Sequence, residues 1–280
     1  MSYKTVRKGL SSLVRLFPKN DKARDFILWP LAHKLLPEDY SEIITLGNGI
    51  RMWVYQDIYD MTNKTLMFLG EDKNFVYEPG TSGLFSRLVK EKKTVLIAGG
   101  HLGYYALLAA KVNPHADVYV FEPTKKMFDR LSKNIALNSF NNIYPEHKAL
   151  SNIQGEVEIV VDNGQSSLIK HEGNSTKKRE MVEAVTIDSY FQDKETKPGM
   201  ILLDVEGFEA LALEGAQHIL ALKPDLILEV NSKMLGKAGT SEALLYEMLS
   251  SKGYNVEKID EMTEEKNHRY FNIFATQKHD

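Results

Sequence analysis

The chain has 280 residues, a formal net charge of −3, 43% hydrophobic residues and 26% charged residues, a composition typical of a globular protein with one large domain or two small ones. It contains no cysteine, which excludes disulfides, cysteine-ligated zinc or iron–sulfur sites and a thiol nucleophile. The small net charge gives no reason to expect nucleic-acid binding, and the composition favours a cytoplasmic enzyme.

The first 90 residues predict an N-terminal extension built from helices and a β-hairpin. Apolar periodicity indicates helices over 5–16 and 22–36. A hairpin is expected from "SEIITL" and "IRMWVY", because the turn at 47–49 between them reads Gly-Asn-Gly, a strong hairpin signal. No apolar run approaches the roughly 18–20 residues that a membrane-spanning helix needs.

The N-terminus is locally basic, since residues 1–25 carry seven Lys or Arg and two Asp. Leu10, Leu13 and Val14 stand at helical spacing in the same segment. One interpretation is a solvated helix packed on the main domain. The other is a helix that lies on an anionic membrane surface or on a partner.

From residue 91 to 280 the pattern changes to apolar strands alternating with helices, which predicts a second domain with a parallel sheet covered on both faces. Two more β segments, "EVEIVV" and "MVEAVTI", bracket a polar loop at 162–180. The tail predicts two strands, "YNVEKI" and "RYFNIFAT", which would close the sheet with an antiparallel hairpin. The other expected strands are 94–98, 118–121, 142–149, 200–204 and 226–230, and the expected helices are 104–112, 124–138, 208–221 and 241–252.

A glycine-rich turn follows the first of these strands, in "VLIAGGHLGYY". Ligands bind beyond the carboxyl ends of the strands in such sheets, so the turn is a candidate site. A nicotinamide-binding fingerprint requires glycine at position 101, where His101 stands, and its side chain would obstruct a pyrophosphate. Gly99, Gly100 and Gly103 therefore mark either a simple tight turn or a site for a ligand without phosphate.

Glu122 follows the second strand, in "VYVFEP". An acid at this place can accept hydrogen bonds from both hydroxyls of a ribose. The alternative is an exposed strand-end carboxylate that caps a neighbouring group. Together with the glycines, Glu122 favours a cofactor that contains a nucleoside but no phosphate, and S-adenosylmethionine meets that description.

Two more carboxylates, Asp204 and Glu206, end a hydrophobic strand in "LLDVEGFEALALEGA". They could take a proton from an attacking hydroxyl or bind the ammonium group of a cofactor. The alternative is that both cap the helix expected from residue 208.

Three histidines are weighed as candidates. His101 could face a ligand, His147 reads as a core or edge residue of a strand, and His171 reads as part of a solvated loop that could lie over the site. No spacing of histidines supports a metal centre, so no metal is predicted.

These pieces, in this order, resemble the FkbM family of methyltransferases from about "GNGIRMWVYQD" to "LILEV", some two-thirds of the chain. The resemblance implies a class I, Rossmann-like methyltransferase fold, with seven mostly parallel strands and an antiparallel terminal hairpin. It also implies S-adenosylmethionine as the donor and, usually, O-methylation of a sugar or natural-product hydroxyl. The matching motifs are "GGHLGYYALLAAK", "VYVFEP", "NIALN", "KALSNIQGEVEIVV", "GQSSL", "VTIDSY", "LLDVEGFEALALEGA" and "PDLILEV".

Carried over by position, the resemblance assigns roles to individual residues. The cofactor loop corresponds to Gly99, Gly100, His101, Gly103 and Tyr104, the ribose acid to Glu122, the stretch beside adenine to Ala149, Leu150 and Ser151, and the catalytic carboxylates to Asp204 and Glu206.

One departure bears directly on function. The family's loop typically begins D-x-G-A-N, whereas this chain reads "IAGGH", so Ile97 cannot supply the carboxylate that helps to hold the methionine end. Another acid such as Asp204 substitutes, or affinity falls by about ten- to a hundredfold, or the site is degenerate. The retained Glu122 and "DVEG" favour substitution.

We therefore expect methyl transfer to a small-molecule or glycan hydroxyl, with no nucleic-acid partner. The alternatives are a non-catalytic binding or regulatory protein with a degenerate cofactor site, and a nicotinamide oxidoreductase. The sequence predicts neither the acceptor molecule nor the oligomeric state.

Overall fold

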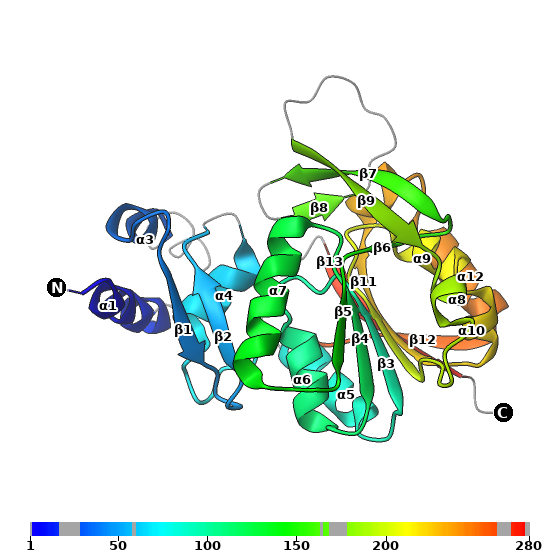
Figure 1. The fold of residues 1–280 in the computed structure, drawn as a ribbon, viewed down its shortest axis with the longest axis horizontal. Coiled ribbons are helices and arrows are strands. Elements are labelled where there is room, and N and C mark those ends of the chain that lie inside the picture. Colours follow the sequence, from blue (N-terminus) through cyan, green and yellow to red (C-terminus); the bar gives the residue numbers. More distant parts are fainter. Residues whose placement is uncertain are drawn as a thin grey trace. The chain divides into compact units, whose positions relative to one another are not determined.

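The computed structural model describes residues 2–16, 29–57, 60–162, 165–167, 178–261 and 270–277 (Figure 1). The chain forms two compact units, Met1–Glu78 and Pro79–Asp280. The sequence places the domain boundary at residue 90 instead, so the two divisions differ by one helix, α5 (Pro79–Val89). His171 and the first residues of the helix predicted over 22–36 lie outside the described part of the chain.

Unit 1 contains the predicted hairpin. Its strands pair antiparallel from Ser41↔Tyr55 to Thr45↔Arg51, which confirms the hairpin signal. An additional helix, not predicted from the sequence, begins after Asp60, whose side chain accepts a hydrogen bond from the N–H of Asn63 and so caps it. The elements of unit 1 are α1 (Tyr3–Leu16), α3 (Trp29–Leu35), β1 (Ser41–Thr45), β2 (Arg51–Tyr55) and α4 (Met61–Leu69).

The basic helix α1 packs inside unit 1. Leu10 and Val14 are buried, while Leu13 is exposed. Arg7 is buried as well: its guanidinium donates to the carbonyl of Met67 at 3.1 Å and to Glu71 at 2.7 Å. The apolar face of α1 therefore packs largely within this unit. Contact of this helix with a membrane stays a prediction.

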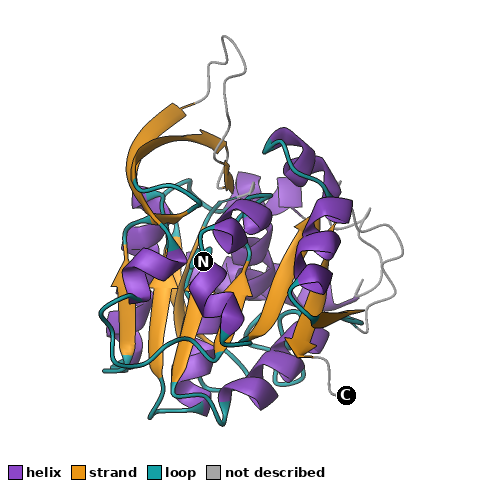
Figure 2. Cartoon of the chain, turned by 90° about the vertical axis from the view of Figure 1, so that its right-hand side faces the viewer, coloured by secondary structure: helices purple, strands orange, loops and turns teal. Residues whose placement is uncertain are grey.

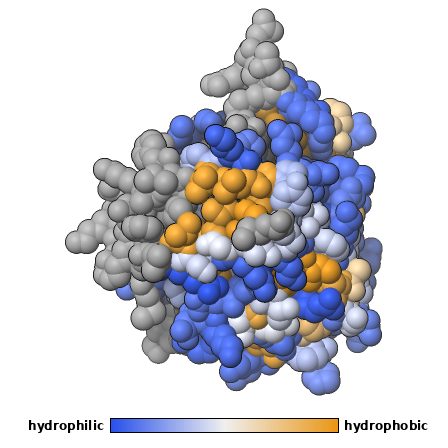
Figure 3. Space-filling model, turned by 90° about the vertical axis from the view of Figure 1, so that its left-hand side faces the viewer, coloured by the Kyte–Doolittle hydropathy of each residue, from blue (hydrophilic) through white to orange (hydrophobic). Residues whose placement is uncertain are grey.

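Exposed apolar side chains also occur in unit 1. Figure 3, seen from the side where α1 and α3 are drawn in Figure 1, shows an apolar area bordered by hydrophilic residues. The exposed side chains of these two helices include Tyr3, Leu13, Leu31 and Leu35. Within the described ranges, no helix combines the length and the apolar character needed to cross a bilayer.

Unit 2 is built on a seven-stranded sheet in the order β12-β13-β11-β10-β3-β4-β5. Every neighbouring pair is parallel except the two pairs that involve β13, which runs antiparallel to both β11 and β12. This confirms the predicted mostly parallel sheet with an antiparallel terminal hairpin. The strands are β3 (Thr94–Ala98), β4 (Asp117–Phe121), β5 (Ile143–Glu146), β10 (Met200–Leu203), β11 (Asp225–Asn231), β12 (Tyr254–Lys258) and β13 (Tyr270–Gln277).

Helices cover both faces of this sheet (Figure 2). The helix predicted over 208–221 is in fact two short helices, because the chain breaks at Gly215, where a Cβ atom would lie 2.2 Å from the carbonyl oxygen of Ser151. Besides α5, the helices are α6 (Tyr104–Val112), α7 (Lys125–Asn138), α8 (Ile187–Phe191), α9 (Glu209–Glu214), α10 (Gln217–Ala221), α11 (Ser232–Lys237) and α12 (Glu242–Ser251).

A second sheet of four strands, ordered β6-β9-β7-β8, accounts for the β segments around residue 160. The strand predicted over 142–149 is wrong as one element, because β5 ends at Glu146 and the chain then joins the second sheet at Ala149. The two segments predicted to bracket a polar loop are confirmed as an antiparallel pair. The strands of this sheet are β6 (Ala149–Leu150), β7 (Gly155–Asp162), β8 (Gln165–Ser167) and β9 (Lys178–Val185).

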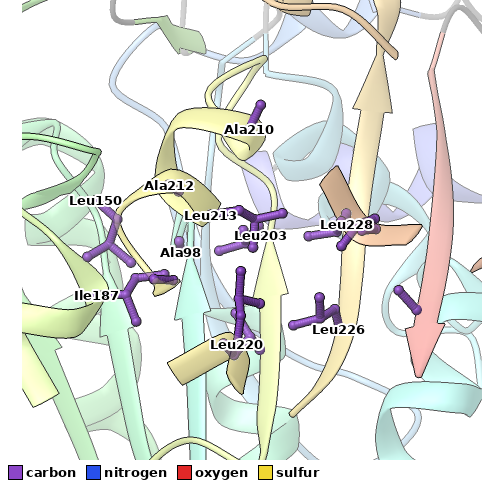
Figure 4. Close-up of a cluster of buried hydrophobic side chains, with 14 of the residues drawn as sticks. Ala98, Leu150, Ile187, Leu203, Ala210, Ala212, Leu213, Leu220, Leu226 and Leu228 are labelled. Carbon is purple, nitrogen blue, oxygen red and sulfur yellow. The ribbon is translucent and has the colours of Figure 1, made fainter. Parts of the chain in front are cut away.

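One large hydrophobic cluster of unit 2 lies on one face of the parallel sheet (Figure 4). Buried aliphatic side chains of three adjacent strands, including Ala98, Leu203 and Leu228, pack there against Ile187 and Leu213 of the helices. Continuous apolar strands of this kind are typical of a sheet covered on both faces. They give the turns at the carboxyl ends of the strands a rigid base.

The strand order places a topological switch point between β3 and β10. From β3 the chain continues outward through β4 and β5, and β10 begins the opposite half with β11. Open α/β sheets bind ligands outside the carboxyl ends of the strands at such a point. In this chain the turns after Ala98 and Leu203 meet there.

Candidate functional site

The glycine turn after β3 is fixed by close backbone packing. The N–H groups of Gly99 and Gly100 both donate to the carbonyl of Phe121, at 3.0 and 2.9 Å. Gly99 has a φ of 84°, and a Cβ atom there would lie 1.8 Å from the carbonyl oxygen of Asp204. The other two glycines pack on side chains of β4 and α7: Gly100 on Val120 and Leu131, and Gly103 on Leu131. The backbone contact at Gly99 and the left-handed φ of Gly99 and of Gly103, which is 91°, favour glycine there without a ligand, and the contact at Gly99 brings the turn against Asp204.

Glu122 is buried and holds this turn in place. One carboxylate oxygen accepts the N–H of His101 at 2.9 Å, and the other accepts the N–H and the hydroxyl of Thr124 at 2.9 and 2.6 Å. A carboxylate has about four acceptor positions, so these three bonds leave one for a further donor. Glu122 therefore caps neighbouring groups, as the alternative interpretation expected, and it still has room to accept a hydrogen bond from a hydroxyl of a ligand.

Asp204 stands at the end of β10, beside the glycine turn. Its N–H donates to the carbonyl of Ala98 at 3.0 Å, and the residue is half-buried. Burial and then the charge of Glu206 raise the pKa of Asp204 to about 6, against a hydrogen bond with Glu229 and the charge of His101, which lower it. A carboxylate with a pKa near neutrality is suited to act as a general base.

Glu229 joins this group from the neighbouring strand. The register pairs Leu203 with Leu228, so the residues that follow, Asp204 and Glu229, lie next to each other at the strand ends. A hydrogen bond between two carboxyl groups requires a proton on one of them. Sequence reasoning missed Glu229, although it ends the "LILEV" strand and the strand-end rule that selected Asp204 applies equally to it.

A further carboxyl group, that of Glu209, lies beneath the turn that carries Asp204 and Glu206. It is fully buried, and one of its oxygens accepts the N–H groups of Val205 and Gly207, each at 3.1 Å. Its second oxygen is buried without a hydrogen-bond partner. Burial raises the pKa of Glu209 to about 8, and the charge of Asp204 raises it in the same direction. Burial therefore favours the protonated form of Glu209, against the backbone hydrogen bonds, which lower its pKa.

The protonated Glu209 makes stability depend on pH. Between its ordinary pKa of 4.5 and the folded value of about 8, the folded chain holds a proton that the unfolded chain has lost. The free energy of unfolding therefore falls as pH rises through this window, by about 1.4 kcal/mol per pH unit from this group. We expect Glu209→Gln to remove that slope in urea unfolding between pH 5 and pH 8, pH values chosen to span this window.

The control for this prediction is Glu247→Gln on α12, since Glu247 is exposed. Its unfolding free energies should follow the wild-type profile. Parallel profiles for wild type and Glu209→Gln would contradict a buried, protonated Glu209.

The structure does not bring every predicted residue to this place. Tyr104 is buried, and its hydroxyl accepts a hydrogen bond from Ser82 of α5 at 3.2 Å, so its ring packs between helices. His147 stacks on Phe128 with ring centroids 4.9 Å apart. The stretch expected beside adenine is buried: Ala149 and Leu150 form β6, and Ser151 donates its N–H to Val185.

Ile97 lies inside the sheet. It pairs with Leu202 of β10 on one side and with Val120 of β4 on the other, and only 1% of its surface is exposed. The carboxyl groups at the switch point come instead from residues that follow the strands, namely Glu122, Asp204, Glu206 and Glu229. In the described part of the chain, no group of three or more potential ligands could hold a metal ion.

Residues 98–256 match the profile of a family described as the methyltransferase FkbM domain. A curated protein, the hexuronic acid methyltransferase AglP of Haloferax volcanii, is 26% identical over 139 residues. The aligned region covers 48% of this chain and 54% of that protein, so the chain spans about half the length of this relative.

Two solved structures that resemble this chain are, by name, a methylase and a methyltransferase. An rRNA methylase from Streptococcus thermophilus gives a TM-score of 0.47 at 9% identity, covering 73% of this chain and 99% of that one. An O-methyltransferase from Bacillus cereus in complex with SAH gives a TM-score of 0.46 at 15% identity, covering 73% of this chain and 83% of that one.

Proposed function

The chain belongs to the FkbM family of methyltransferases, and from that premise we propose that it transfers a methyl group from S-adenosylmethionine to a hydroxyl of a sugar, a glycan or another small molecule. The observation that carries the proposal is the meeting of the glycine turn, Glu122 and Asp204 at the switch point of the sheet. The absence of cysteine fits a cytoplasmic enzyme.

The chemistry of the side chains at the switch point fits this donor. The groups there are the carboxyls of Glu122, Asp204, Glu206 and Glu229, together with His101. Clustered carboxylates favour a ligand that carries positive charge and hydroxyl donors, and they oppose a pyrophosphate. S-adenosylmethionine has a sulfonium, an ammonium and a ribose, whereas a nicotinamide cofactor carries two phosphates.

Bound in this place, S-adenosylmethionine would supply a methyl group already activated by the positive sulfur. Glu122 would accept a hydrogen bond from the ribose through its remaining acceptor position. The carboxylate of Asp204 would accept the proton that the acceptor hydroxyl loses, since it is ionised above a pH of about 6. Glu206 is the second candidate for this role and for contact with the ammonium group.

The buried Ile97 favours a second candidate function, a binding or regulatory protein with a degenerate site. The carboxyl pair of Asp204 and Glu229 supplies negative charge at the same sheet edge, which supports substitution of the missing acid. We therefore place the catalytic function first.

The acceptor proposed first is a sugar hydroxyl. Its support is the relative named as a hexuronic acid methyltransferase, of which this chain spans about half.

Two measurements test the proposal. Calorimetric titration with S-adenosylmethionine and S-adenosylhomocysteine should show binding, and NADH should show none. Incubation with methyl-deuterated S-adenosylmethionine and a panel of hexuronic acids, neutral sugars and nucleotide sugars should yield a methylated product by mass spectrometry. No heat with either methionine derivative at millimolar concentration would favour the degenerate site, and binding of NADH alone would revive the oxidoreductase.

A further inference from the structure

The turn from Asp204 to Phe208 has an unusual backbone. Glu206 has a φ of 53° and the next residue, Gly207, a φ of 98°, so two consecutive residues are in the left-handed region. A left-handed conformation is costly for a glutamate and persists only where surrounding groups impose it. A side chain at Gly207 would also collide with the backbone of Met234, 2.4 Å from its carbonyl carbon.

One carboxyl oxygen of Glu209 accepts two hydrogen bonds from the backbone of this turn. The N–H of Val205 lies before Glu206 and the N–H of Gly207 lies after it, and both donate to the same carboxyl oxygen of Glu209 at 3.1 Å. Successive N–H groups that converge in this way form a concave nest for an acceptor atom. The two bonds orient the Asp204–Val205 peptide group and the Glu206–Gly207 peptide group, that is, the backbone directly after Asp204 and directly after Glu206.

We propose that Glu209 is a positioning residue, which holds the turn in the shape that presents Asp204 and Glu206 to the ligand. The inference rests on the proposed function, because that function assigns the ligand to this sheet edge. Glu209 itself would not touch the ligand: its side chain is fully buried beneath the turn and acts through the two backbone bonds. Displacements of about 1 Å in such groups cost about a hundredfold in rate, so this support matters to catalysis.

Two substitutions separate this role from simple packing. Glu209→Gln keeps a carbonyl oxygen as the acceptor and resembles the protonated acid in shape. Glu209→Met fills a similar volume but removes the acceptor, and an apolar side chain suits a fully buried position. Glu214→Gln is the matched control, since Glu214 is exposed in the same helix and accepts a bond from Asn152.

The first readout is amide hydrogen exchange at Val205 and Gly207. Glu209→Met should exchange about tenfold faster at these two amides, because each loses its acceptor, while Glu209→Gln and Glu214→Gln should exchange like the wild type. The second readout is the affinity for S-adenosylhomocysteine by calorimetry, which should fall by about fivefold in Glu209→Met alone. Should that variant not fold, Glu209→Ala replaces it, as it also lacks the acceptor.

Unchanged exchange in Glu209→Met, or faster exchange with unchanged affinity, would overturn the positioning role. If the proposed function itself is wrong, the wild-type protein will not bind S-adenosylhomocysteine, and this result distinguishes the two failures. The exchange measurement needs no ligand and still decides whether Glu209 holds the turn.

Discussion

Replacing Asp204 by asparagine is expected to lower turnover by about a hundredfold or more. Asparagine has nearly the same shape, so the turn and its contact with Gly99 are retained, but it cannot take up the proton of the acceptor hydroxyl. The pKa of Asp204 is about 6, so wild-type turnover should rise with pH through this value and level off above it. The residual activity of the variant should lack that step.

Methyl transfer to the acceptor found by the mass-spectrometric panel is the measurement, made between pH 5 and pH 8 to span the pKa of about 6. Asp129→Asn serves as the control, because Asp129 is exposed on α7 and pairs with Lys125. Full turnover in Asp204→Asn would reduce Asp204 to a structural role and turn attention to Glu206.

Replacing Glu122 by alanine is expected to weaken binding of S-adenosylmethionine and S-adenosylhomocysteine by at least about tenfold. The variant loses the charged acceptor for the ribose, and it also frees the N–H of His101 in the glycine turn. Both losses act in the same direction. Calorimetry on the folded variant measures the effect.

Thr124→Val is the control for Glu122→Ala. It removes the hydroxyl that donates to Glu122 at 2.6 Å but leaves the carboxylate and its bond from His101. We expect its affinity to stay within about threefold of the wild type. An unchanged affinity in Glu122→Ala would contradict the ribose assignment.

Local pattern was sufficient to predict the elements that form the base of the site. The strand expected at 94–98 and the helix expected at 104–112 coincide with β3 and α6, because a short, fully apolar run and an alanine- and leucine-rich segment flank the glycine turn. The hairpin and the closing antiparallel strand were equally accessible, since turn residues mark them.

Tertiary contacts decided what the sequence could not show. The break in the helix expected over 208–221 arises where Gly215 meets the carbonyl of Ser151, which comes from a distant segment. Glu209 reads in the sequence as an ordinary first-turn acid of that helix. Its burial, and the convergence of two N–H groups on one of its oxygens, follow only from the packing of the turn.

Backbone meets backbone where the glycine turn touches Asp204, since no side chain separates Gly99 from that carbonyl. The two segments therefore have to be exchanged as a pair if a chimera is built with another member of the family. Grafting only residues 97–104, or only residues 202–209, would join surfaces shaped by different partners. By contrast, Ile97 is buried within its strand and takes no part in this junction.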